Sequence, residues 1–256
     1  MRRWITYLSE ARTGVTLAIL AAFSRCVSEL GIAMMVGGNI KGRTRTLATA
    51  TAMETGKGEF AQGLAMGLIL LAFGIKCAFP LLHNWLVDAY PESTVGGTVF
   101  LSAFTTKVAV YALARCFPGF EPLVYVGAAM TAFPIFYAVI ENDLRRVLAY
   151  SLNNQLGFMV VGIGIGTELA LNGAAAHAFA HILYKALLFM GAGAVIQMTG
   201  KRLLTEMGGL YRTMPKTVAL YMVGACAISA FPLFSGFVSK SMVVSAAGED
   251  HRMTIF

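Results

Sequence analysis

The chain has 256 residues, of which 57% are hydrophobic and 13% are charged, and its mean hydropathy is +0.69. Because soluble globular domains carry about a quarter charged residues, this composition excludes an ordinary soluble domain and predicts an all-α, polytopic membrane helix bundle. The net charge of +7 does not indicate nucleic-acid binding, because most basic residues lie in connectors between apolar runs, as membrane topology requires.

Apolar runs long enough to cross about 30 Å of hydrocarbon predict about seven membrane spans. We expect the first to remain in the protein, because no A-x-A-like cleavage site follows it. The four cysteines contain no C-x-x-C pair, so neither a zinc site nor a disulfide framework is predicted. The spans lie near residues 13–37, 61–82, 95–115, 121–140, 147–167, 171–198 and 217–239.

The first span and its connector form a segment of their own. Arg25 and Glu29 are four residues apart on one helical face, so we expect them to pair. The connector VGGNIKGRTRTLATATAMETGKGEF is basic and glycine-rich, which fits either an anion-binding loop or a solvated basic loop. The candidate anion-binding residues are Gly37, Gly38, Asn39, Lys41, Arg43 and Arg45.

Residues 1–70 resemble the last part of the membrane permease of tungstate-type oxyanion ABC transporters. The resemblance lies in SEARTGVTLAILAAFSRCVSELGIAMMVGGNIKGRTRTLATATAMETGKGEFAQGLAMGLILL. It implies an oxyanion permease fragment whose partner is an ABC ATPase. We therefore treat residues 1–70 and 71–256 as two predicted domains.

The second span places Lys76 four residues before Pro80. A proline breaks or kinks a helix, and broken membrane helices recur where they line a cavity, so this lysine predicts an ion or proton path. His83, Trp85 and Asp88 follow at the far end of the span. A similar break is expected at Pro232 in the last span.

Two further lysines interrupt apolar sequence. Lys107 has apolar runs on both sides and cannot easily extend its stem to water, which favours a functional role. Lys240 lies at the end of its span, where a lysine can also simply snorkel to the interface.

His177, His181 and Lys185 are spaced four apart and share one face of a helix. The H-A-F-A-H pair lacks the glutamate of H-E-x-x-H and an accompanying ligand cluster, so a zinc site is not predicted. Histidine titrates near neutral pH, which favours a proton relay. Packing of hydrogen-bonded histidines in a core helix is the alternative.

The basic connectors set the expected topology. The connector before the fifth span contains Asp143, Arg145 and Arg146, and a second basic connector follows two spans later. Because two spans separate them, the two connectors lie on one side of the membrane, which is predicted to be cytoplasmic. The same parity predicts a cytoplasmic amino terminus for a multi-pass protein of the cell (inner) membrane. The second connector contains Lys201, Arg202, Arg212 and Lys216.

From residue 74 to 240 the chain resembles the proton-conducting membrane subunits shared by respiratory complex I and the multisubunit cation/proton antiporters, and is most similar to the D-type subunits of the antiporters. The segments are GIKCAFPLLHNWLVDAYPE, LSAFTTKVAVYALAR, ENDLRRVLAYSLNNQLGFMVVGIG and HAFAHILYKALLFMGAGAV, with GGLYRTMP and FPLFSGFVSK.

The resemblance implies that Lys76 belongs to a discontinuous helix, Lys107 to the centre of the next, and Lys240 to a second discontinuous helix. With Lys185, His177 and His181 these lysines form the expected relay, supported by Asp88, Asp143, Pro80 and Pro232. The implied partners are other antiporter or complex I-like membrane subunits and the lipid bilayer. No cofactor is expected, and redox or ATPase chemistry would lie on other subunits.

The family pattern also implies two inverted five-helix repeats, of which the first is incomplete here. Two alternatives to a proton-translocating subunit therefore stand: the oxyanion permease fragment, and a nonfunctional fusion or truncated product with a junction near residues 65–73.

Overall fold

The computed structural model describes residues 60–249, and the chain divides into two units, Met1–Ile69 and Leu70–Phe256. Of the described residues, 60–69 belong to the first unit and 70–249 to the second. The predicted span 13–37, the Arg25–Glu29 pair and the candidate anion-binding loop lie outside the described residues. The predicted domain boundary at residue 70 stays a prediction.

The described residues are helical, with one isolated antiparallel bridge between Asp143 and Leu203. The elements are α3 (Phe60–Lys76), α4 (Asn84–Glu92), α5 (Val95–Phe100), the π-helical turn η1 (Leu101–Thr105), α6 (Thr106–Cys116), α7 (Pro122–Ile140), α8 (Leu144–Ile165), α9 (Glu168–Thr199), the 3-10 turn η2 (Leu204–Glu206), α10 (Leu210–Thr213), α11 (Pro215–Ile228) and α12 (Ser235–Glu249). Most of the long helices correspond to apolar runs in the sequence, whereas α4, α10 and most of α12 lie outside the predicted spans.

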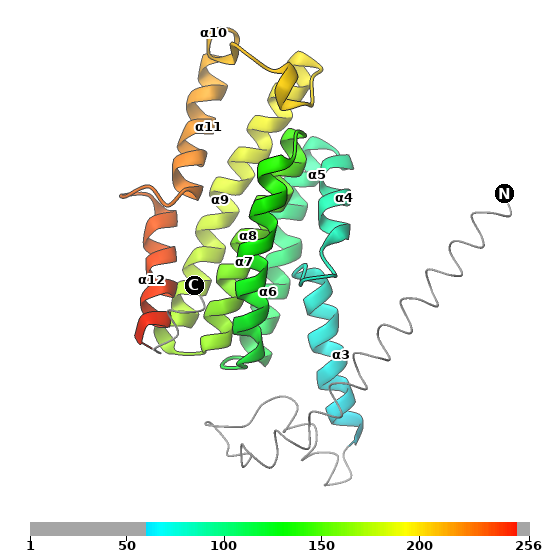
Figure 1. Ribbon diagram of the computed structural model, residues 1–256, viewed down its shortest axis with the longest axis vertical. Coiled ribbons are helices and arrows are strands. Elements are labelled where there is room, and N and C mark those ends of the chain that lie inside the picture. The colour runs from blue at the N-terminus through cyan, green and yellow to red at the C-terminus, as the bar shows by residue number, and fades with distance from the viewer. Residues whose placement is uncertain (1–59, 250–256) are drawn as a thin grey trace, which may run out of the picture. The chain divides into compact units, whose positions relative to one another are not determined.

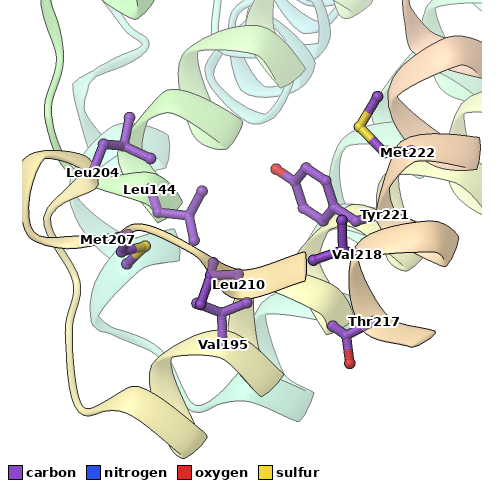
Figure 2. Close-up of a pocket in the computed structure, with 9 residues that line it drawn as sticks. All are labelled: Leu144, Val195, Leu204, Met207, Leu210, Thr217, Val218, Tyr221 and Met222. Carbon is purple, nitrogen blue, oxygen red and sulfur yellow. The ribbon is translucent and has the colours of Figure 1, made fainter. Parts of the chain in front are cut away.

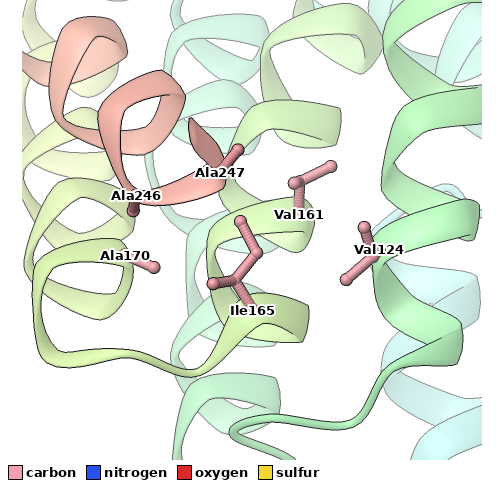
Figure 3. Packing of buried hydrophobic residues seen from close by; sticks show 6 residues of the cluster. All are labelled: Val124, Val161, Ile165, Ala170, Ala246 and Ala247. Atoms are coloured by element: carbon pink, nitrogen blue, oxygen red, sulfur yellow. The ribbon is translucent and has the colours of Figure 1, made fainter. Parts of the chain in front are cut away.

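The long helix α9 is the centre of the bundle (Figure 1), because α5, η1, α6, α8, α11 and α12 all pack against it. At one end, small and branched apolar side chains from α7, α8, α9 and α12 form a common core (Figure 3). This core consists of Val124, Val161, Ile165, Ala170, Ala246 and Ala247.

By length and hydropathy alone, the described residues contain three segments able to cross a bilayer: Val95–Cys116, Pro122–Ile140 and Glu168–Thr199. They correspond to three of the predicted spans. The predicted span 147–167 is α8, whose amide side chains lower its hydropathy. The remaining two, 61–82 and 217–239, are each interrupted by a break, after which the chain continues in another short helix, α4 or α12.

Both breaks are built alike. The tetrapeptide Ala-Phe-Pro-Leu occurs at 78–81 and again at 230–233, and in each copy the alanine and the leucine have positive φ, between 57° and 75°. The backbone hydrogen bonds also correspond: the phenylalanine N–H donates to Gly74 O in the first break and to Cys226 O in the second. Proline cannot donate and excludes the helical hydrogen bond, so α3 stops before the first copy and α11 before the second. The interruptions predicted at Pro80 and Pro232 are thus observed.

Helices α7 and α8 approach each other at two glycines. A methyl group on Gly127 would lie 2.7 Å from the backbone nitrogen of Val161 and 2.8 Å from the carbonyl oxygen of Gly157. Backbone atoms cannot move aside as a flexible side chain can. Close packing of small residues of this kind holds membrane helices together.

We expect Gly127→Ala to lower the free energy of unfolding by about 1–3 kcal/mol, because the added methyl overpacks the α7–α8 contact. Gly96→Ala is the matched control: no atom lies within 4 Å of its added methyl, so helix propensity alone acts and stability rises by up to about 1 kcal/mol. Detergent-induced unfolding of the purified chain measures both. A loss of equal size in the two variants would contradict the packing argument.

Candidate functional site

The polar stripe predicted on α9 faces the interior. His177, His181 and Lys185 are all fully buried, with 0% exposure. Lys185 Nζ donates to the Ser151 hydroxyl of α8 at 2.6 Å and lies 5.6 Å from the centre of the Phe189 ring. Lys185 therefore points into the bundle, toward a polar neighbour.

The other end of the stripe meets α12. His177 Nδ1 is 2.9 Å from the hydroxyl of Ser239, the residue before Lys240. Lys240 Nζ donates to the carbonyl of Ile228 at 2.7 Å, at the broken end of α11. The ring of Phe158 lies between them, with its centre 6.0 Å from the His177 ring and 5.3 Å from Lys240 Nζ.

Lys107 is held by the π-helical turn that precedes it. Its Nζ donates to Ser102 O at 2.7 Å and to the Thr106 hydroxyl at 3.2 Å, and its exposure is 7%. A π-helical turn leaves carbonyl oxygens without their usual α-helical partners, and such turns are frequent at functional sites. Here Lys107 takes one of these carbonyls and the Tyr90 hydroxyl takes another, Leu101 O, at 2.9 Å. Burial of Lys107 was predicted, whereas the π-helical turn was not.

A row of amides on α8 continues the polar interior. Asn154 Nδ2 donates to Thr131 O at 2.5 Å, Gln155 Nε2 donates to Asn154 Oδ1 at 2.7 Å, and Tyr184 OH donates to Gln155 Oε1 at 3.4 Å. Asn153 is fully buried. Sequence reasoning did not select these residues as site candidates. The signal was present, because three consecutive amides in an apolar helix are costly unless they are bonded.

Several buried polar atoms of this region have no protein partner among the described residues: His177 Nε2, both ring nitrogens of His181, and both amide atoms of Asn153. Buried polar groups are normally hydrogen-bonded to protein or to ordered water. Imidazole can both donate and accept, so these atoms suit bound water or an arriving proton. We give the name α9 track to four residues: His177, His181 and Lys185 on α9, and Lys240 on α12.

Three other predicted site residues, Lys76, Asp88 and Asp143, lie apart from the α9 track, as does His83. Lys76 is the last residue of α3 and is exposed. Asp88 is exposed and lies 3.7 Å from Arg146 in an ion pair. His83 immediately precedes α4 and packs against the Phe133 ring, at 4.8 Å between centroids. Asp143 is at the start of α8.

Asp143 caps α8 and joins the two basic connectors. Its Oδ1 accepts from the backbone N–H groups of Arg145 and Arg146, at 2.8 Å and 3.1 Å, and its Oδ2 accepts from Arg202. Arg202 also donates to Glu92 at 2.8 Å. This hydrogen bond lowers the pKa of Glu92 and raises the pKa of Arg202. The two connectors therefore lie at one end of the bundle, as predicted.

Arg145 is a residue that sequence reasoning placed in a basic connector, and the structure shows it buried at 9% exposure. Its guanidinium donates to Ser93 O at 2.8 Å, to Tyr90 O at 3.2 Å and to the Thr98 hydroxyl. All three contacts are made by one guanidinium nitrogen, Nη2, at the far end of the side chain. Arg145 thus fixes the junction of α4 and α5, directly before the π-helical turn that holds Lys107.

The described residues contain no group of three or more His, Cys, Asp or Glu side chains able to hold a metal ion. His177 and His181 accordingly lack further ligands in the part of the chain that the structure describes. Cys77, Cys116 and Cys226 are free thiols, while Cys26 lies outside the described residues.

Comparison with known proteins identifies the family. The sequence pattern of the family described as NADH:quinone oxidoreductase/Mrp antiporter, TM, matches residues 1–256, including the first 70. The chain is 36% identical over 192 residues to NADH-quinone oxidoreductase subunit N of Desulforudis audaxviator, covering 71% of this chain and 38% of that protein. It is 35% identical over 189 residues to the D subunit of the Na(+)/H(+) antiporter of Alkalihalophilus pseudofirmus, covering 70% and 38%.

Solved structures agree on the fold. A chain of the Mrp complex from Dietzia sp. DQ12-45-1b superposes with a TM-score of 0.74 at 26% identity, covering 97% of this chain and 46% of that one. A chain of an archaeal membrane-bound sulfane sulfur reductase gives a TM-score of 0.70 at 23% identity, covering 93% and 50%. The chain spans less than half the length of the two curated relatives. It is an integral, multi-pass membrane protein, and it belongs to the transmembrane family of NADH:quinone oxidoreductases and Mrp antiporters.

Proposed function

We propose that this chain is a proton-translocating membrane subunit of a multisubunit cation/proton antiporter or NADH-dehydrogenase-like complex, and that protons move along a buried Lys/His relay. The observation that carries the proposal is the α9 track, with three fully buried titratable side chains one helical turn apart and ring nitrogens that have no partner among the described residues. Both curated relatives are named as subunits, one of an oxidoreductase and one of an antiporter, which supports membership of such a complex.

Burying a charged lysine inside the bundle has a free-energy cost. A lysine inside a membrane helix costs about 2.5–3.5 kcal/mol on insertion scales, so such residues usually serve an ion or proton path. Lys107, Lys185 and Lys240 each have a hydroxyl or carbonyl acceptor within 2.7 Å. These acceptors hold the charged form, while the surrounding apolar helices favour the neutral form. An amine balanced in this way can accept and release a proton.

Lys107→Ala is expected to reduce proton transport by at least about tenfold in proteoliposomes containing the assembled complex, because general acid–base groups of this kind contribute about 10²–10⁴-fold. Lys201→Ala is the matched control, since Lys201 is exposed and its Nζ donates to Glu206 O, away from the α9 track. An entrapped pH-sensitive dye measures the flux. Unchanged transport by an assembled Lys107→Ala complex would show that the relay assignment is wrong.

The permease resemblance of residues 1–70 stays a prediction, because nearly all of that segment lies outside the described residues and the family match also runs through it. No observation on residues 60–249 favours oxyanion transport over proton translocation. The exposed position of Lys76 makes it the weakest relay candidate of the four lysines, and its role, like those of Asp88 and Asp143, stays a prediction.

A further inference from the structure

An apolar pocket lies at the end of the bundle that carries the connector between α9 and α11 (Figure 2). Its volume is about 260 Å³. Side chains from α8, α9, the connector and α11 converge on it. The lining residues are Leu144, Val195, Leu204, Met207, Leu210, Thr217, Val218, Tyr221 and Met222.

The pocket adjoins an exposed apolar surface. Met222 on its wall is 55% exposed, and Leu220 and Val223 on the same helix are also exposed. In a membrane bundle, apolar surface of this kind faces acyl chains. Pockets for drug-sized ligands have volumes of about 300–1,000 Å³, and this pocket is slightly smaller. Because its lining also contains few polar groups, a narrow hydrocarbon chain fits it better than a polar ligand does.

Positive charge without a carboxylate partner lies beside the same pocket, and Arg212 contacts the neighbouring Tyr211, to whose hydroxyl its Nε donates at 2.8 Å. Arg212 follows the lining residue Leu210 by two positions, and Lys216 directly precedes Thr217. Both are exposed, and within residues 60–249 neither forms an ion pair with a carboxylate, in contrast to Arg202, which pairs with Glu92 and Asp143. Basic residues next to a pocket between membrane helices are typical of sites for anionic lipid headgroups.

We propose that this pocket binds one anionic phospholipid, with an acyl chain among Val195, Val218 and Tyr221 and the phosphate held by Arg212 and Lys216. The charge complementarity favours a lipid of net negative charge over a zwitterionic one or a neutral helix of another protein. This site is separate from the α9 track, so the proposal does not depend on proton translocation.

The test uses the purified full chain in nanodiscs of phosphatidylglycerol and phosphatidylcholine with identical acyl chains, and native mass spectrometry counts the retained lipids. We expect one preferentially retained phosphatidylglycerol. Arg212→Gln should weaken its retention about fivefold, the effect of one basic residue near an anionic headgroup. Arg115→Gln is the control, because Arg115 is also exposed but lies at the end of α6, away from this connector.

A second pair of variants tests the acyl-chain site. Val218→Trp fills the pocket and should abolish the preference, whereas Val223→Trp, on the exposed side of the same helix, should leave it unchanged. If Val218→Trp fails to fold, the two arginine variants decide. Equal retention of both lipids by the unmodified chain, or equal effects of Arg212→Gln and Arg115→Gln, would overturn the proposal. So would a photoreactive residue at Met222 that cross-links to protein rather than to lipid.

Discussion

Replacing Lys185 with methionine is expected to abolish proton transport and, at the same time, to stabilise the fold. The amine is fully buried, donates to Ser151 and lies over the face of Phe189. Methionine has a similar length and no charge, so the desolvation cost disappears while the packing is kept. We expect transport to fall by about 10²-fold or more and the free energy of unfolding to rise by about 1–3 kcal/mol.

Opposite signs for activity and stability distinguish a relay residue from a packing residue. Proteoliposome flux and detergent-induced unfolding measure the two quantities on the same preparation. Lys201→Met, at an exposed lysine of the connector, should change neither. A fall in stability together with transport would mean that Lys185 serves mainly to hold α8 against α9 through Ser151, and a normal flux would exclude it from the relay.

Arg145→Met should cause the largest loss of stability among the single substitutions considered for this chain. It leaves Ser93 O, Tyr90 O and the Thr98 hydroxyl without their shared donor inside the bundle. Tyr90 O keeps the Ser93 and Thr98 hydroxyls as donors, so the main loss is the two hydrogen bonds from the charged donor to Ser93 O and the Thr98 hydroxyl. At about 1.5–3 kcal/mol for each bond to a charged group, we expect a total loss of about 3 kcal/mol or more. Lysine at this position should recover only part of it, because its shorter side chain carries the Nζ donor less far than the Nη2 nitrogen that makes all three contacts.

The adjacent residue supplies the control. Arg146 has the same side chain at the next position, but it is 42% exposed and its contact with Asp88 is 3.7 Å long. Exposed ion pairs of this kind contribute at most about 1 kcal/mol, so Arg146→Met should be nearly neutral. Similar losses for the two variants would mean that positive charge at this end of the bundle, rather than the specific contacts of Arg145, stabilises the fold.

Hydropathy and proline positions predicted much of the architecture, because a membrane solvent imposes simple rules on backbone pairing. Both helix breaks occur where proline removes a donor. The burial of Lys107 and Lys185 followed from the apolar residues around them. The Ala-Phe-Pro-Leu tetrapeptide also occurs twice in the sequence. This repeat indicates that the two breaks have the same structure more directly than either proline alone does.

The structural features that the sequence did not predict depend on contacts between residues far apart in the chain. The π-helical turn before Lys107 exists because Tyr90, from another helix, and Lys107 itself satisfy the carbonyls that it frees. In the sequence, Arg145 is indistinguishable from the other basic residues of the connectors. Its acceptors come together only in the folded α4–α5 junction. The serines that bond Lys185 and His177 lie on α8 and α12, too far along the chain for spacing rules to connect them.

We propose that Lys107 and Lys185 belong to one proton path. Proton flux in proteoliposomes should therefore be measured for Lys107→Ala, Lys185→Met and the double variant in the same assembled complex. Residues that act as a unit are strongly non-additive, so we predict that each single variant lowers transport at least about tenfold and that the double variant is no worse than the more severe single one. Partial losses that multiply in the double variant would contradict a single path, and normal flux in any of the three would exclude it.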